Sequence, residues 1–330
     1  MNHLAFQVKR LLSRYPPLKR VASALRRKVL PHWRRGLASR HWDDRVEQVE
    51  GTAPQGWLDS EIVEREHIRP QISGDPEVSY LEYFLRRHLP HRPVDRLASL
   101  GCGGGNLERD LLRLEAAHRI DGFDESPASI GLAQELASTE GLDGSLHYQV
   151  ADLNRLELEA GAYDGVVVKM ALHHFEALEH VYGQIRRALR PGGLLMFNEF
   201  VGPSRFQWTD LQLQHMNQLL SSLPKGLARR VPVVVIRRPL VADMIAQDPS
   251  ESIRSAEILP RLEKDFEIVE RKDYGGTLLH ILLDHVLPIL DLDDPEHLAI
   301  LQRFMARERE LLADGTLPSD FTFVVARPLP

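Results

Sequence analysis

The feature that most constrains this 330-residue chain is a cluster of glycines at residues 101–105. The cluster follows a short apolar run at residues 97–100, and leucines then recur at positions 107, 111, 112 and 114. An apolar run, a glycine-rich turn and a helical pattern in this order predict a buried strand, a tight turn and a helix N-terminus. Glycines permit positive φ and let a ligand approach the backbone, while the first helical turn offers unpaired N–H groups. The sequence therefore predicts a ligand-binding corner.

The spacing of the glycines limits the class of ligand that the turn can bind. A dinucleotide fingerprint needs G-x-G-x-x-G, but the sixth position counted from Gly101 is Asn106, and counted from Gly103 it is Glu108. The pattern present is G-x-G-x-G, completed by Gly105. It resembles the first motif of the class I S-adenosylmethionine-dependent methyltransferases, whose loop holds the amino-acid end of the cofactor. The spacing disfavours an NAD-linked oxidoreductase.

Apolar runs alternate with helical patterns downstream of the glycines, which favours βαβ units and a parallel sheet. The predicted strands are residues 97–100, 120–124, 147–152, 163–170, 189–199, 267–272 and 320–326. Their order completes the resemblance to the class I methyltransferases. The resemblance implies an α/β fold with a Rossmann-like seven-stranded sheet and helices on both faces. A helical N-terminal extension and insertions after strands five and six are also expected.

An acid at the end of the second predicted strand is the first candidate for cofactor binding. Asp124 follows Gly101 by 23 positions, and a carboxylate there can accept both ribose hydroxyls of an adenosine ligand. The alternative is a turn acid ahead of the next helix. By resemblance, Asp152 faces the adenine amino group and Leu153 packs on the ring, although Asp152 taken alone is as consistent with a loop cap. The full set of expected cofactor residues is Gly101, Cys102, Gly103, Gly105, Asp124, Glu125, Asp152, Leu153, Lys169 and Met170.

Three titratable residues follow the next two predicted strands. His173 and His174 come directly after strand four, and Glu199 ends strand five. Ligand sites of α/β sheets lie at the carboxyl ends of the strands, and imidazole titrates near neutrality, so these residues are candidate catalytic bases. The alternative for the histidine pair is a packing or capping turn without catalytic duty. The segment after strand five, with Arg205, Gln207 and Trp208, is expected to line the pocket. No metal ion is expected.

Charge is distributed unevenly along the chain. Residues 1–42 contain eleven Lys or Arg and no acid, whereas the rest of the chain has 30 basic and 47 acidic residues. Residues 1–42 also carry two amphipathic helical patterns. Such an arm can pack on the main domain, lie on an anionic membrane surface or meet an acidic partner. We expect no nucleic-acid partner, because the remainder is acidic and has no recognised binding module.

The expected organisation is a basic arm at residues 1–42, a helical cap at 43–93 and a methyltransferase domain at 94–330. Insertions are expected at residues 201–260 and 278–314. Within these parts the patterns predict a loop at 69–76, helices at 80–88, 210–220 and 295–313, and a strand-like segment at 231–236. The single cysteine excludes an internal disulfide, and a reducing cytoplasm is the simplest location.

These patterns predict S-adenosylmethionine-dependent methyl transfer to a small-molecule or glycan-type acceptor, at oxygen rather than nitrogen. The alternative from a different class is a cofactor-fold binding module that docks a partner or a membrane through its basic arm without turnover. The complete set of cofactor acids argues against that alternative.

Overall fold

The computed structural model describes residues 56–330. The predicted basic arm at residues 1–42 and the beginning of the predicted cap lie outside the described residues, so the structure does not test them. None of the described helices is both long enough and apolar enough to span a bilayer.

A seven-stranded sheet with the order β3-β2-β1-β4-β5-β7-β6 forms the centre of the fold. Strands β1 to β5 are parallel, and β7 pairs antiparallel with both β5 and β6. This sheet confirms the predicted Rossmann-like fold. The strands are β1 Val94–Leu100, β2 Ala117–Asp124, β3 Leu146–Val150, β4 Tyr163–Lys169, β5 Leu189–Phe200, β6 Phe266–Gly275 and β7 Phe321–Pro328.

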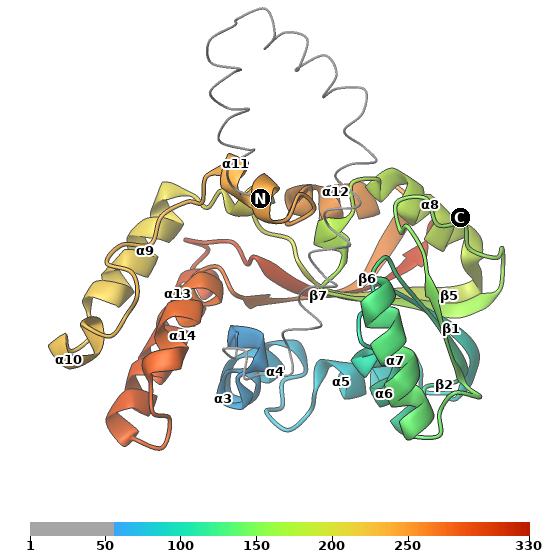
Figure 1. The fold of residues 1–330 in the computed structure, drawn as a ribbon, viewed down its shortest axis with the longest axis horizontal. Coiled ribbons are helices and arrows are strands. Elements are labelled where there is room, and N and C mark those ends of the chain that lie inside the picture. Colours follow the sequence, from blue (N-terminus) through green and yellow to red (C-terminus); the bar gives the residue numbers. More distant parts are fainter. Residues whose placement is uncertain (1–55) are drawn as a thin grey trace, which may run out of the picture.

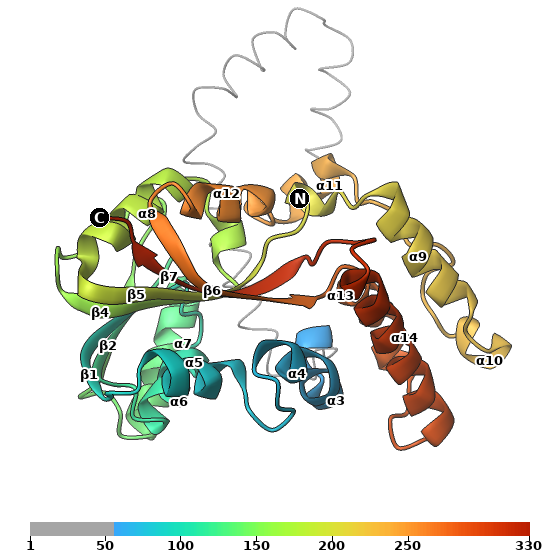
Figure 2. The same cartoon turned by 180° about the vertical axis from the view of Figure 1, so that it is seen from behind.

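Helices cover both faces of the sheet. Figures 1 and 2 show α8 and α12 on one face and α5, α6 and α7 on the other. Central strands covered on both faces read as continuous apolar runs, which is why residues 97–100 and 165–168 are buried without alternation. The helices are α3 Glu61–Val63, α4 Arg69–Ile72, α5 Tyr80–His88, α6 Asn106–Arg113, α7 Pro127–Thr139, α8 Leu178–Ala188, α9 Asp210–Ser221, α10 Lys225–Ala228, α11 Val241–Gln247, α12 Ile258–Leu262, α13 Leu279–Val286 and α14 Pro295–Ala313.

Local signals fix several helix starts. Ser126 caps α7 by accepting a hydrogen bond from the N–H of Ser129, and Pro127 occupies the first turn, where its missing N–H costs nothing. Thr209 and Gln212 form a reciprocal capping box at the start of α9. Ser79 with Glu82 caps α5 and Asp294 caps α14 in the same way, which explains why the helices predicted at residues 80–88 and 295–313 coincide with α5 and α14.

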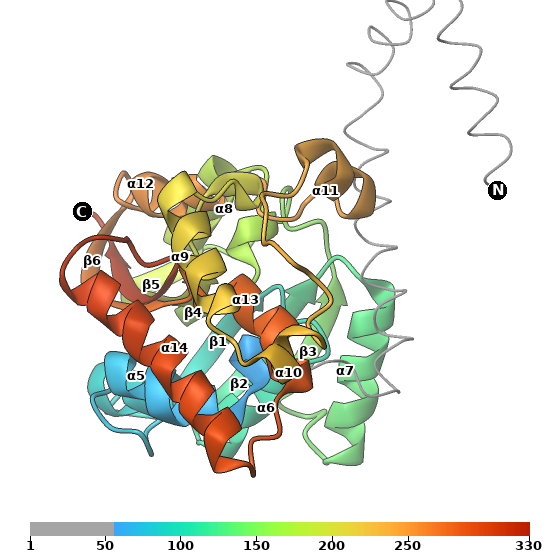
Figure 3. The same ribbon diagram turned by 90° about the vertical axis from the view of Figure 1, so that its left-hand side faces the viewer.

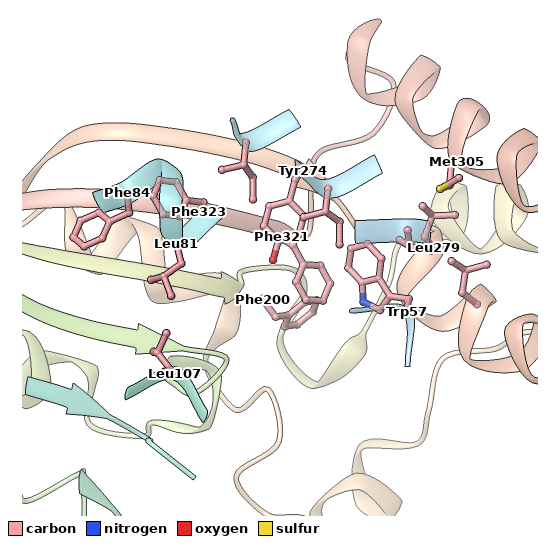
Figure 4. Packing of buried hydrophobic residues seen from close by; sticks show 14 of the residues in the cluster. Trp57, Leu81, Phe84, Leu107, Phe200, Tyr274, Leu279, Met305, Phe321 and Phe323 are labelled. Carbon is pink, nitrogen blue, oxygen red and sulfur yellow. The ribbon is translucent and has the colours of Figure 1, made fainter. Parts of the chain in front are cut away.

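A second group of helices extends the molecule beyond one end of the sheet. Figure 3 shows α9, α13 and α14 gathered at the end of the sheet where β5 finishes. The hydrophobic core is continuous with this group, because Trp57, Phe200 and Phe321 link the strands to Leu279 of α13 and Met305 of α14 (Figure 4). The Trp57 and Phe321 ring centroids are 4.9 Å apart in an edge-to-face arrangement. The helices α9, α13 and α14 are therefore built on the same core as the centre of the sheet.

Two secondary-structure predictions are wrong. Residues 231–236 are not a strand: Val234 is 93% exposed, and the N–H of Ile236 donates to the side chain of Asn217 at 2.8 Å. A single extended run needs a partner strand, and this segment pairs with none of the described strands. The predicted loop at 69–76 begins with helix α4, which tolerates Pro70 because a proline fits the first helical turn.

Candidate functional site

The glycine turn joins β1 to α6. Gly101, Gly103 and Gly105 have φ of 72°, 51° and 76°, values that favour glycine. A Cβ on Gly101 would lie 2.3 Å from the Cβ of Ala171, and one on Gly105 would lie 2.4 Å from the Tyr148 hydroxyl. A Cβ on Gly103 would contact nothing within 4 Å. Packing therefore requires the outer two glycines, whereas Gly103 faces open space.

A cavity of about 230 Å³ lies at the carboxyl edge of the sheet beside this turn. Six of the ten predicted cofactor residues line it: Gly101, Gly103, Asp124, Glu125, Leu153 and Met170. Of the other lining residues, the sequence singles out only His174. The rest are Ser129, Asn154, Ala171, Phe175, Glu176, Pro249, Ser250 and Ile253. Asn154 and Ser129 lie within five residues of the predicted acids Asp152 and Asp124. Their closeness in sequence to these acids could have indicated that they line the cavity. Pro249, Ser250 and Ile253 carry no such signal.

Asp124 connects the end of β2 to the glycine turn. Its carboxylate accepts a hydrogen bond from the N–H of Gly103 at 2.9 Å and another from the N–H of Ser126 at 2.9 Å. These bonds give Asp124 the turn role, and Asp124 also lines the cavity. Its role as a cofactor ligand stays a prediction.

Four predicted cofactor residues do not line the cavity. Cys102 is buried behind the turn, and burial raises the pKa of its thiol well above the usual value, as expected of a side chain that fills space and not of a reactive thiol. Gly105 packs against Tyr148. Asp152 accepts a hydrogen bond from the N–H of Asn154 at 3.0 Å, and Lys169 lies over the ring of Tyr80 with its Nζ 5.9 Å from the centroid.

The structure brings His173 and Glu199 into direct contact. The Nδ1 of His173 donates to Oε1 of Glu199, which also accepts from the N–H of Phe200 at 2.7 Å. Its Oε2 accepts from the N–H groups of Ala171 and Leu172 at 2.8 and 2.7 Å. The Glu199 side chain is fully buried and its oxygens are occupied by these four bonds. This geometry makes Glu199 a positioning residue for the histidine turn.

His174 lines the cavity itself. The Ser250 hydroxyl donates to the carboxylate of Asp248 at 2.6 Å, so its oxygen is left to accept from the Nδ1 of His174, 3.1 Å away. The hydrogen-bond network therefore assigns the proton of a neutral His174 to Nδ1 and a lone pair to Nε2.

The two adjacent histidines have opposite pKa shifts. Burial opposes a charge on His173, but the charges of Glu199, Glu251 and Asp248 outweigh it and raise its pKa to about 9. Burial and the nearby charge on His173 lower the pKa of His174 to about 4. At neutral pH the turn therefore holds an imidazolium at position 173 and a neutral imidazole at position 174, with ring centroids 4.1 Å apart.

Glu251 completes the histidine cluster from the insertion after β5. Its Oε1 lies 3.8 Å from Nε2 of His173, and one ligand atom each from His173, His174 and Glu251 lie within 4.8 Å of one another. A single ion held at about 2.1 Å would need neighbouring ligand atoms about 3.4 Å apart. We therefore interpret this cluster as an ion-pair network around the His173 imidazolium.

The segment that carries Glu251 is held in a strained conformation. Within residues 56–330, five residues other than glycine have positive φ, and four of them (Met170, Arg205, Phe206 and Ser252) surround the cavity or its rim. The guanidinium of Arg205 donates to the carbonyls of Glu251 and Pro249 at 2.7 Å each. Arg205 therefore shapes the rim and is not among the lining residues, contrary to expectation.

Gln207 and Trp208 support the same region from behind. The amide of Gln207 donates to the carbonyls of Arg205 and Pro239 at 2.9 and 3.0 Å. Trp208 is buried and stacks on Phe206 with centroids 5.3 Å apart. Neither residue lines the cavity, so their predicted role as pocket walls is also wrong.

Comparison with known proteins places this geometry in a family. Residues 98–197 match the family model described as "Methyltransferase domain". A sterol 24-C-methyltransferase (ERG6B) of Gibberella zeae is 28% identical over 157 residues, covering 48% of this chain and 41% of that protein. The 27-O-demethylrifamycin SV methyltransferase of Amycolatopsis mediterranei is 31% identical over 115 residues, covering 34% and 41%. The matched part thus spans about two-fifths of the length of these relatives.

Among solved structures, a geranyl diphosphate C-methyltransferase from Streptomyces coelicolor A3(2) superposes with a TM-score of 0.50 at 16% identity. The superposition covers 89% of this chain and 98% of that one, which shows the shared fold. The match to the methyltransferase domain and the shared fold support the class I S-adenosylmethionine-dependent methyltransferase family for this chain. The cavity fits the cofactor of that family, because the carboxylate of Asp124 and the glycine turn meet there. In this turn Gly103 faces open space.

Proposed function

We propose that this protein transfers the methyl group of S-adenosylmethionine to a hydroxyl group of a small-molecule acceptor. The observation that carries the proposal is the His174 imidazole, which lines the cavity and is oriented there by the Ser250 hydroxyl, 3.1 Å from its Nδ1. A hydroxyl is a poor nucleophile and must lose its proton as it attacks, so a positioned base contributes where an amine or a thiolate would need none.

The residues at the cavity are assigned separate contacts with the cofactor. Asp124 and Glu125 supply acceptors for the ribose hydroxyls, and Leu153 supplies an apolar surface for the adenine. Gly103 lets the ligand approach the backbone. The bound cofactor supplies an electrophilic methyl group on a sulfonium, and transfer is an in-line displacement. The protein therefore needs mainly to align the acceptor, which is a matter of proximity and orientation.

Proton removal is assigned to His174. Its Nε2 takes the proton of the acceptor hydroxyl while the new C–O bond forms and the C–S bond breaks. His173 cannot serve as the base at neutral pH because it already holds two protons. It is positioned by Glu199, and its charge keeps His174 neutral. Ser250 orients the Nδ1 side of His174.

Methylation at carbon is the second candidate. The curated relatives include sterol 24-C-methyltransferases, and aromatic rings gather beyond the end of β5. Phe200 lies edge to face with Phe206 at 5.2 Å, and Phe206 stacks on Trp208, but these rings lie behind the cavity wall. The ring that lines the cavity is Phe175, and an aromatic face can stabilise the cation that forms when an olefin is methylated.

The test is an acceptor screen with the full-length protein and methyl-labelled S-adenosylmethionine. Hydroxylated, olefinic and amino small molecules are offered in parallel, and the labelled product is located by mass spectrometry and NMR. We expect transfer to a hydroxyl. Transfer to an olefinic carbon would select the second candidate, and transfer only to amines would contradict the role of His174. Calorimetric titration with S-adenosylmethionine tests cofactor binding separately from acceptor choice.

A further inference from the structure

A loop between α10 and α11 exposes an unusual number of apolar side chains. We call residues 229–241 the arginine-valine loop. Val234 is 93% exposed, Leu240 69%, Val235 47% and Val241 39%. Exposed apolar side chains are common singly, but four within eight residues form a patch, and such patches mark contact with a partner or a membrane. Figure 3 shows the loop crossing from α10 to α11 at the end of the molecule where α9 lies.

The exposure is fixed by the structure of the loop. Ile236 is buried at 4% exposure, and its backbone N–H and carbonyl both bond to the side-chain amide of Asn217, at 2.8 and 2.9 Å. The carbonyl of Pro239 accepts from Gln207 at 3.0 Å, and the guanidinium of Arg238 donates to the carbonyl of Trp208. The loop is therefore anchored on α9 and on the segment before it. Ile236 faces in, and Val234 and Val235 face outward.

The charge around the loop is also distinct. Residues 211–242 contain no Asp or Glu and five basic residues, although the chain from position 43 onward is strongly acidic. Four of the five are the pairs Arg229-Arg230 and Arg237-Arg238, which flank the valines. All four arginines are exposed, and among the described residues only Arg238 forms an ion pair with a carboxylate, that of Asp210.

We propose that the arginine-valine loop is a docking surface for an anionic lipid membrane. Apolar side chains at the tip of an anchored loop can enter the acyl boundary, and arginines at its base reach the phosphate level with their guanidinium groups while their stems stay apolar. Each cationic side chain near an anionic leaflet strengthens binding. A nucleic acid would not use the valines.

The position of the loop connects this surface to the cavity. Helix α11 follows the loop and leads directly into residues 248–253, which supply Pro249, Ser250 and Ile253 to the cavity lining. A membrane-bound protein would therefore hold the rim of its cavity close to the lipid surface. The inference does not depend on the acceptor chemistry proposed above, because it rests only on exposure and charge.

The test is vesicle flotation of the full-length protein. Vesicles of phosphatidylcholine with about a third phosphatidylglycerol are compared with pure phosphatidylcholine at 50 and 300 mM NaCl. We expect binding to the anionic vesicles that weakens at high salt. The variant V234S/V235S/L240S should bind at least tenfold more weakly. The variant R229Q/R230Q/R237Q should lose about a hundredfold, because each arginine is worth roughly a fivefold change in affinity.

A matched control comes from β6, which exposes Val269 at 44% and the neighbouring Arg271 away from the loop. The variant V269S/R271Q should bind within twofold of the unmodified protein. Insertion is measured directly with Val234→Cys carrying an environment-sensitive fluorophore, since the native Cys102 is buried. Its emission should shift to the blue with anionic vesicles, and that of labelled Val269→Cys should not.

Three outcomes overturn the proposal. One is failure of the full-length protein to float with anionic vesicles at 50 mM NaCl. Another is undiminished binding of both loop variants, which would assign membrane contact to residues elsewhere in the chain. The third is a dimer in light scattering that the valine substitutions dissociate without any change in vesicle binding, which would make the loop an interface between copies of this protein.

Discussion

The cofactor side and the acceptor side of the sheet are built in different ways. On the cofactor side, β1 and β2 end in a glycine turn and in Asp124, and the three lining residues Gly101, Gly103 and Asp124 lie within about two dozen residues of one another in sequence. On the acceptor side, His173, Glu199 and Glu251 come from three separate segments. The difference teaches that a backbone-based site has a local sequence signature, whereas a side-chain network assembled over about 80 residues shows in the sequence only at its strand ends, at His173 and Glu199, and not at Glu251.

The largest expected effect tests the acceptor side. His174→Ala removes the assigned base, and we expect turnover on the acceptor found in the screen to fall by about 10²- to 10⁴-fold. Affinity for S-adenosylmethionine, measured by calorimetry, should change only a few-fold, because His174 is one of fifteen residues that line the cavity. Turnover within a few-fold of the unmodified protein would make the histidine turn structural.

The dependence of the methyl-transfer rate on pH tests the same assignment of His174 as the base. Burial and the charge of His173 lower the pKa of His174 to about 4, so His174 is already neutral above pH 5. The pKa of His173 is raised to about 9, so its charge is lost only above that pH. We expect a rate that is flat from pH 6 to 8 and rises above 9, because loss of the His173 charge makes the neutral His174 a stronger base. A rise centred near the unperturbed value of about 6.5, which the sequence alone predicts, would contradict these shifts.

The next effect tests the cofactor side. Gly101→Ala places a Cβ 2.3 Å from that of Ala171 and forces alanine into a positive φ of 72°. We expect a loss of about 2 to 5 kcal/mol in the free energy of unfolding, measured with urea, together with loss of cofactor binding. Gly103→Ala is the matched control: it has positive φ but no atom within 4 Å, so only the backbone strain of about 1 to 2 kcal/mol applies. Equal losses in the two variants would show that packing against Ala171 is unimportant.

A smaller effect is expected at the end of β2. Asp124→Ala removes an acceptor for the ribose and also the bond to the N–H of Gly103. Hydrogen bonds to a charged acceptor are worth about 1.5 to 3 kcal/mol each, so affinity for S-adenosylmethionine should fall at least tenfold by calorimetry. Asp124→Asn keeps one carbonyl oxygen and should lose less. Unchanged affinity in the alanine variant would remove Asp124 from the cofactor site.

The smallest effect concerns a buried acid behind the glycine turn. Burial raises the pKa of Glu108 to about 7, and its Oε1 accepts from the hydroxyl of Ser99. The folded state therefore holds the proton more tightly than the unfolded state, so this contribution to stability is present below about pH 4.5 and is lost as the pH rises toward 7. Glu108→Gln should stabilise the protein at pH 8 by on the order of 2 kcal/mol, and hardly at pH 4.5. Parallel stability curves for the two proteins between pH 4.5 and 8 would show that Glu108 is ionised in the fold.

The sequence determined the sheet, the glycine turn and the acid of β2, because each depends on short-range rules: apolar runs for buried strands, glycine where φ is positive, and an acid beside a helix start. The positions of Asp124 and Met170 at the cavity could be predicted from the sequence in this way. Lys169 was not, because the direction of its side chain, over Tyr80 and away from the cavity, depends on how α5 packs beneath β4.

Only the tertiary structure decided the acceptor side. No local pattern shows that Glu251 meets His173, that Ser250 orients His174, or that Arg205 fixes the rim through the carbonyls of residues 249 and 251. The protonation states of the two histidines follow from those contacts, because a charge in a buried site is set by the groups around it. The valines at 231–236 show the same limit: their composition suits a strand, and the lack of a partner strand among the described residues leaves them as an exposed loop.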